Sequence, residues 1–130
     1  MSDTFKILGQ EEATTAEVAL YTVPVASTTS TGGVFVAPKS ITLPVQALVS
    51  SLIVCGTTGG NFTVGLQTLA DWTAAAPLTD KQYIFKLVPI ATATTKILKL
   101  GLTLAPGDRI VIQADAPGVA SITAMGIEVQ

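Results

Sequence analysis

Leucine alternates with polar residues over the most clearly patterned stretch of the chain, Lys96 to Leu104. Every second position there is leucine, namely Leu98, Leu100, Leu102 and Leu104. Successive side chains of a β-strand point to opposite faces, so a period of two predicts a strand with one apolar face. The stretch from Arg109 to Ala114 repeats the pattern, with Ile110 and Ile112 inward and with Arg109, Val111 and Gln113 on the other face.

The stretch from Val45 to Cys55 is apolar on both parities. Val45, Val49, Ile53 and Cys55 share one parity, and Leu48, Leu52 and Val54 share the other. Two apolar faces are typical of a strand that is covered on both sides. We therefore predict a central strand, or one that an oligomer partner covers.

Further runs rich in threonine, valine, isoleucine and leucine, separated by glycine and proline turns, predict strands at Phe5–Leu8, Glu17–Val23, Phe62–Leu69, Gln82–Pro89 and Ser121–Val129. Gln10–Leu20, rich in alanine and glutamate, is a competing helical turn. Ala26–Ser40 predicts a Ser/Thr/Gly loop with a small edge strand at Val34–Val36, and Ala70–Asp80 predicts an irregular connection. The expected fold is an all-β, single-domain antiparallel β-sandwich of about eight strands, either a jelly roll or Ig-like. It spans residues 1–130, with 1–16 as an N-terminal arm and 26–40 as an inserted loop.

Charged residues are scarce. Seven basic and nine acidic side chains make up 12% of the 130 residues, whereas an ordinary soluble domain has about 25%. A mass of 13.3 kDa suits one domain with about 6,500 Å² of folded surface, or about one charge per 400 Å². Such a surface is weakly protected against association, so the composition favours a chain that other protein covers.

The charge pattern and the missing residue types weaken several functional classes. The lysines and the single Arg109 are scattered over a chain of pI 4.8, which disfavours nucleic acid as a partner. Without histidine and with one cysteine, histidine-dependent triads and cysteine-rich zinc sites are excluded. We expect no enzyme activity, no metal and no cofactor. No run of about 20 apolar residues predicts a membrane span, and the N-terminus lacks the apolar region of a signal peptide.

Three positions with reactive or motif-like residues have plainer structural interpretations. We interpret Cys55 as a small buried hydrophobe, because no positive charge lies near it in the sequence. Asn61, in Asn-Phe-Thr, follows two glycines and is interpreted as a turn residue rather than a glycosylation site. Asp108 and Arg109 are interpreted as turn chemistry rather than as a catalytic pair.

Two groups of residues remain as weaker candidates for a site. Glu11, Glu12 and Glu17 form the one acidic cluster, which we interpret as a solvated segment or as an arm that pairs with a neighbour's lysines. Trp72 and Tyr83 are candidate sugar contacts, because aromatic faces can stack on sugars. Trp72 in an alanine-rich loop equally suits a plug at the end of a sandwich.

A series of short motifs runs in order along the chain: Phe5–Gln10, Leu20–Pro24, Ala47–Cys55, Lys81–Ile84, Leu102–Asp108 and Gly126–Val129. This series resembles small β-sandwich virion structural proteins of tailed bacteriophages, and it leaves Ala26–Ser40 as an insertion. The resemblance implies a non-enzymatic virion component, made in the host cytoplasm without a signal peptide. A capsid decoration (cement) protein is the first expectation. A neck or tail structural protein, or a carbohydrate- or receptor-binding tail module, is the alternative.

The expected partners are the chain itself, as a homotrimer, and the major capsid or the neck and tail proteins; nucleic acid and membranes are not expected. Obligate interfaces are apolar and contain few charges. The candidate assembly contacts are Phe5 and Ile7 of the N-terminal arm and Val34, Phe35 and Val36 of the inserted loop. Both segments are apolar or extended and lie outside the predicted sandwich.

Overall fold

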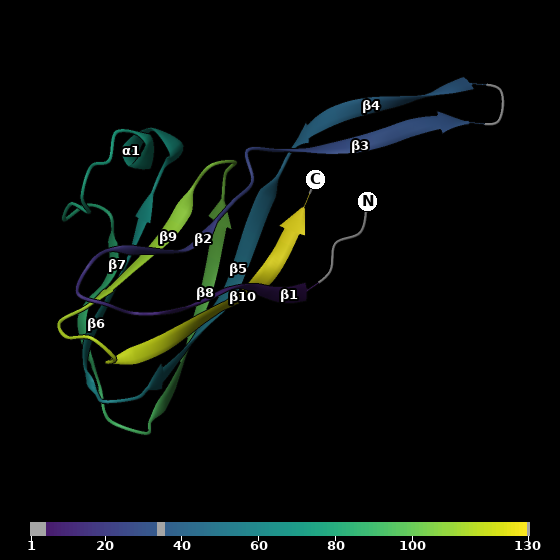
Figure 1. The fold of residues 1–130 in the computed structure, drawn as a ribbon. Coiled ribbons are helices and arrows are strands. Elements are labelled where there is room, and N and C mark those ends of the chain that lie inside the picture. The colour runs from purple at the N-terminus through teal and green to yellow at the C-terminus, as the bar shows by residue number, and fades with distance from the viewer. Residues whose placement is uncertain (1–4, 34–35, 130) are drawn as a thin grey trace.

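Two four-stranded antiparallel sheets pack face to face in the computed structural model, which describes residues 5–33 and 36–129 (Figure 1). The first sheet has the strand order β1 (Phe5–Glu12), β10 (Ala120–Val129), β5 (Gln46–Gly56), β8 (Thr95–Leu104). The second has the order β2 (Val18–Thr22), β9 (Arg109–Ala114), β6 (Gly60–Gln67), β7 (Tyr83–Ile90). The predicted all-β sandwich of eight strands is thereby confirmed.

The strands pair as though one long hairpin had been rolled up. β1 pairs with β10, β2 with β9, β5 with β8 and β6 with β7, each time antiparallel. The lateral pairs β10–β5 and β6–β9 complete the two sheets. Nested pairing of eight strands in two sheets is the topology of a jelly roll, so the observed fold is the first of the two predicted alternatives.

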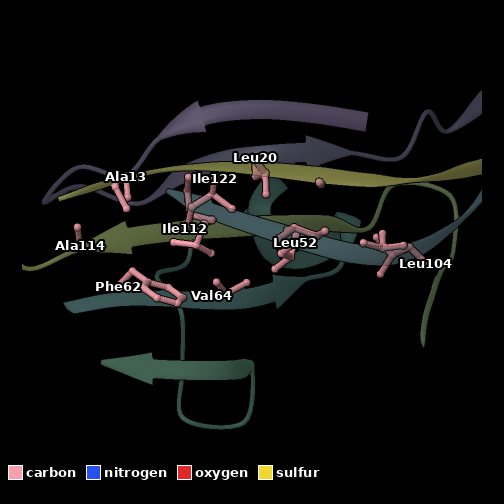
Figure 2. Packing of buried hydrophobic residues seen from close by; sticks show 14 of the residues in the cluster. Ala13, Leu20, Leu52, Phe62, Val64, Leu104, Ile112, Ala114 and Ile122 are labelled. Atoms are coloured by element: carbon pink, nitrogen blue, oxygen red, sulfur yellow. The ribbon is translucent and has the colours of Figure 1, made fainter. Parts of the chain in front are cut away.

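Aliphatic side chains and Phe62 fill the space between the sheets (Figure 2). The alternating leucines of β8 pack against this cluster and Leu104 is buried within it, as the leucine pattern predicts. Ile110 and Ile112 of β9 are buried there too. Val111 lies on the other face of β9, as predicted, outside this cluster. It is nevertheless fully buried, because the chain itself covers the outer face of the second sheet.

β5 lies inside the first sheet, but the predicted parity of its residues is wrong. Its register to both neighbouring strands shifts at Ser50, which forms a β-bulge. A bulge adds one residue, so the parity reverses beyond it. Val49 and Leu52 therefore both face the core with no exposure. The outward residues of β5 are Leu48, Ser51, Ile53 and Cys55.

Residues 5–12 are part of the sandwich rather than an arm outside it. β1 pairs with β10 from Phe5, opposite Ile127, to Glu12, opposite Ser121, with a register shift around Leu8. The backbone ladder explains why this segment is ordered as an edge strand. The competing helix at 10–20 does not form, since β1 is followed by β2 without a helix between them.

Residues 26–44 form a hairpin rather than the predicted loop. β3 (Ala26–Gly33) and β4 (Val36–Pro44) pair with each other as a separate two-stranded sheet. The hairpin extends away from the sandwich beyond the start of β5 (Figure 1). The prediction weighed the serine and glycine content and undervalued the β-branched threonines, which favour strands. Of the predicted contacts, Val34 and Phe35 lie outside the described residues, and Val36 is the first residue of β4.

The connection from β6 to β7 contains α1 (Leu69–Thr73), the one helix of the described residues. It begins with a capping box. Thr68 Oγ1 accepts a hydrogen bond from the Asp71 N–H at 3.4 Å, and Asp71 Oδ2 accepts one from the Thr68 N–H at 3.1 Å. The spacing Thr68-x-x-Asp71 is a readable helix start, which the prediction of an irregular connection missed. Within residues 5–33 and 36–129, no helix is long and apolar enough to cross a membrane.

Candidate functional site

The chain covers the outer face of its own second sheet with the β6–β7 connection, residues 68–82. Leu78 lies over Gly65, where its Cδ2 would be 2.6 Å from any Cβ at that position. A glycine is therefore needed for this close approach. Val111 pairs with Gly65 in the β6–β9 ladder and is buried with Leu78 outside the main core. The second sheet thus has apolar contacts on both faces.

Gln67, which is 1% exposed, ties this cover to the sheet. Its Nε2 donates to the Ala76 carbonyl at 2.8 Å, and its Oε1 accepts from Nε and Nη2 of Arg109 at 3.1 and 2.9 Å. The Arg109 guanidinium lies 5.5 Å from the centroid of the Trp72 ring, a cation–π contact. Trp72 Nε1 donates to the Gly107 carbonyl at 2.7 Å. Arg109 and Trp72 therefore hold the connection against β9.

Two carboxylates fix the rest of the cover. Glu17 Oε2 accepts a hydrogen bond from the Leu78 N–H at 2.9 Å, so this member of the acidic cluster has a structural partner. Asp71 Oδ2 also accepts from Gln82 Nε2 at 3.0 Å. The hydrogen bond from the Thr68 backbone N–H, which favours the charged form, holds the pKa of Asp71 below its usual value.

The outer face of the first sheet has no such cover from the described part of the chain. Residues paired across antiparallel strands share a face, so the ladders define four rows across this surface, which we call the bare face. The rows are Phe5–Ile127–Leu48–Thr103, Ile7–Met125–Ser51–Lys99, Gln10–Thr123–Ile53–Ile97 and Glu12–Ser121–Cys55–Thr95. The first two rows lie toward the end at which the hairpin leaves the sandwich. The first row is mostly apolar, the second and third are mixed, with Lys99 in the second, and the last row is mostly polar.

The bare face contains four of the eight large hydrophobic side chains that are exposed among the described residues, and a fifth adjoins its first row. The four are Phe5 at 54%, Ile7 at 52%, Leu48 at 42% and Ile97 at 63%, and the fifth is Val129 at 37%, which pairs with Gln46. Singly scattered apolar residues need no explanation, but a contiguous patch marks an interaction site. We therefore take the bare face as the candidate functional site. The predicted contacts Phe5 and Ile7 lie on it, on an edge strand rather than on a free arm.

A charged cluster anchors the strand that presents Phe5 and Ile7. Glu128 accepts a hydrogen bond from the Tyr21 hydroxyl at 2.9 Å and forms an ion pair with Lys6 at 2.5 Å. The hydrogen bond from Lys6 lowers the pKa of Glu128, and burial together with the Glu128 carboxylate raises the pKa of Tyr21. The cluster connects β1, β10 and β2, so the edge strand is fixed to both sheets.

The polar end of the bare face has a shallow hollow with acidic walls. Its lining residues are Gln10, Glu11, Glu12, Ser121, Ile122 and Thr123. Glu11 and Glu12 are exposed, and no lysine or arginine with a described side chain forms an ion pair with either of them. The hollow therefore gives the polar end of the bare face a negative charge.

The two candidate sugar contacts do not form one surface. Trp72 packs on Arg109, whereas Tyr83 lines a separate cleft of about 320 Å³ that Trp72 does not reach. Lys86 Nζ lies 4.8 Å from the centroid of the Tyr83 ring. Both rings thus have partners within the chain, which suits the plug interpretation of Trp72, and sugar binding stays a prediction.

The remaining singled-out residues have local roles. Cys55 is partly exposed on the bare face rather than buried, because the bulge reverses its parity; its Sγ lies 3.7 Å from Thr95 Oγ1. Asn61 donates from its backbone N–H and its Nδ2 to Asp115, both at 3.1 Å, as a turn residue does. Asp108 accepts from the Ala105 N–H at 2.9 Å in the β8–β9 turn. Among the described residues, no group of three or more Cys, Asp and Glu could hold a metal ion.

Leu48 and Ile97 belong to the bare face, and the sequence prediction did not single them out. A signal for each was present in the sequence. Ile97 occupies the otherwise polar parity of the Lys96–Leu104 strand, and Leu48 lies in the stretch that is apolar on both parities. The sequence alone could not predict that they lie on the same face as Phe5 and Ile7, because this depends on the order and register of four strands.

Comparison with known proteins yields no match: no family model, no curated protein and no solved structure matches the chain. A function must therefore be argued from the bare face and from the motifs of the sequence.

Proposed function

We propose that the chain is a non-enzymatic structural component of a bacteriophage particle, a homo-oligomeric capsid decoration (cement) protein that stabilises the head. The bare face carries this proposal, because a contiguous apolar surface of this kind marks a site of protein association. Jelly rolls occur in viral capsid proteins, lectins and cupins alike, so the fold alone does not select a function. The bacteriophage particle enters through the resemblance of the sequence motifs.

The two outer faces of the sandwich differ in a way that supports assembly. The second sheet is covered by residues 68–82, which Gln67 and Arg109 hold in place. The corresponding surface of the first sheet carries Phe5, Ile7 and Ile97, each more than half exposed. Burying the exposed half of one such side chain stabilises a complex by about 0.8–1.5 kcal/mol. A partner that covers the bare face thus gains most of the apolar contact that the folded chain leaves unused.

The oligomeric state tests the first part of the proposal. Light scattering of the purified chain should give an oligomeric mass, with a trimer as the expected order. Ile7→Asp should weaken association at least about tenfold, because a charge then replaces an apolar contact in the interface. Leu87→Asp is the matched control, since Leu87 is similarly exposed at 57% but lies on β7 of the second sheet. Equal effects of both substitutions would contradict a role for the bare face.

The location in the particle tests the second part. Antibody labelling of purified particles should place the chain over the head surface, at a copy number comparable with that of the major capsid protein. A small ring of copies at the neck or tail would replace decoration by the alternative structural role. Absence of the chain from purified particles would refute the virion proposal altogether.

A further inference from the structure

We propose that the bare face is covered in the assembly by the β3–β4 hairpin of a second copy of this chain. The inference rests on the proposed function, because it names the partner in the assembly. It assigns a role to the hairpin, whose strands belong to neither four-stranded sheet. The contact joins two different surfaces, a hairpin and a sheet face, so it is heterologous and each copy both gives and receives one.

The β3–β4 hairpin forms a two-stranded sheet of its own. β3 and β4 pair with each other and with no strand of the two four-stranded sheets. A two-stranded ribbon alone is marginally stable in water, and it gains stability by packing on another surface. In Figure 1 the hairpin extends away from its own sandwich. A second copy is therefore the nearest source of a surface for it.

The alternation along β4 matches the order of rows on the bare face. Leu43, Ile41 and Lys39 occupy alternate positions of β4, opposite Ser27, Thr29 and Thr31. From the base of the hairpin, at Ala26 and Pro44, towards its tip, these alternate positions are therefore apolar, apolar and basic. From its hairpin end, the bare face begins with two rows in which five of the eight residues are apolar, and it ends at Glu12 in the acidic hollow.

The charges are complementary as well. Lys39 is the one charged residue between Ala26 and Pro44, and Glu12 is exposed at the polar end of the bare face. Four residues of strand separate Lys39 from Leu43, about 13 Å, and six residues of β10 separate the first row from the last, about 20 Å. A hairpin with Leu43 over the first row, at Phe5 and Ile127, therefore places the position of Lys39 within about two residues of the row that contains Glu12.

The area is sufficient for a stable contact. A ribbon two strands wide and eight residues long has a flat footprint of roughly 10 Å by 27 Å. In a ring of three, each copy gives one hairpin and receives one, so each copy buries two footprints, about 540 Å² of its own surface, before the relief of the side chains is counted. Specific interfaces begin at about 1,000 Å² in total, or about 500 Å² per partner. The footprint of the hairpin on the bare face is thus large enough for a specific interface.

Mixing two complementary variants tests the proposal. The first is Ile7→Asp, which keeps the hairpin and damages the face. In the second, residues 27–43 are replaced by Asn-Gly; Ala26 and Pro44 are register partners, so a two-residue turn can join them. Each variant alone should be monomeric with a β-type circular-dichroism spectrum. A mixture of the two at high protein concentration should form a one-to-one pair, which is weaker than the wild-type assembly because it keeps a single hairpin-on-face contact.

A charge reversal tests the direction of the hairpin. Lys39→Glu and Glu12→Lys should each weaken association about three- to tenfold, and the double reversal should restore it to within about twofold. A double variant as weak as the single variants would refute the placement of Lys39 over Glu12.

Other outcomes separate the inference from the proposed function. If the hairpin-less protein stays oligomeric while Ile7→Asp is monomeric, the bare face packs on itself or on another surface. The hairpin proposal is then wrong and the assembly function stands. A mixture that remains monomeric also overturns the hairpin proposal. A wild-type chain that is monomeric and absent from particles overturns both.

Discussion

Replacing Gln67 by methionine removes the polar link between the second sheet and its cover while keeping a side chain of similar length. The wild-type amide donates one hydrogen bond to the Ala76 carbonyl and accepts two from the Arg109 guanidinium, at 1% exposure. A hydrogen bond between neutral groups contributes about 1 kcal/mol, and bonds to a charged group about 1.5–3 kcal/mol. Arg109 is half-buried and regains some bonds to water. We therefore expect a loss of about 2–4 kcal/mol in the free energy of unfolding.

Urea unfolding at one fixed protein concentration measures this loss, because an oligomer's stability depends on concentration. Trp72 is the only tryptophan and stacks on Arg109, so its fluorescence reports directly on the cover. Its emission should shift to longer wavelength in the native state of Gln67→Met. Gln113→Met is the matched control: Gln113 donates one hydrogen bond, to the Thr15 carbonyl at 2.8 Å, and its loss should cost about 1 kcal/mol or less.

An unchanged stability of Gln67→Met would refute this prediction. A Gln67→Met variant within about 0.5 kcal/mol of the wild type, the range of ordinary surface substitutions, with unchanged Trp72 emission, would show that the network does not hold residues 68–82. The hydrogen bonds of Gln67 would then not explain why residues 68–82 cover the second sheet while the bare face of the first sheet has no such cover from the described residues.

Three further predictions address the strand that carries the candidate contacts and the face itself. Gly9→Ala should destabilise the fold by at least about 3 kcal/mol in urea unfolding, because the new Cβ would lie 2.1 Å from a backbone carbonyl oxygen of β2; Gly101→Ala, with open space around it, should stay within about 0.5 kcal/mol. The pKa of Glu128 is lowered in the fold, so its contribution to stability is present above the ordinary value of 4.5 and is lost as the pH falls through the folded pKa; Glu128→Gln should flatten this acid limb, and an unchanged limb would count against it. Cys55 should react with a thiol reagent several-fold faster in monomeric Ile7→Asp than in the wild-type oligomer, since the face that contains it is then uncovered; equal rates would indicate that the oligomer covers another surface.

The fold class and the character of the surface follow from local patterns in the amino-acid sequence. The period of two in Lys96–Leu104 and Arg109–Ala114 identified strands with an inner face, because alternation is a local property of extended backbone. The 12% charge content indicated a surface prone to association. The apolar residues on both parities of Val45–Cys55 indicated that this strand needs cover on two sides. Each inference needs no knowledge of a distant contact.

The tertiary structure alone decided which residues share a face and which face is left uncovered. The bulge at Ser50 reverses the parity of β5 and moves Cys55 outward, and a bulge forms in response to the neighbouring strands rather than to the local pattern. The bare face joins Phe5, Leu48 and Ile97 from three strands, so its apolar character exists only once their register is set. Residues 68–82 cover the other sheet through contacts such as that of Glu17 with Leu78, 61 residues apart. Contacts over such separations are selected by the packing of the whole sandwich, and no local pattern encodes them.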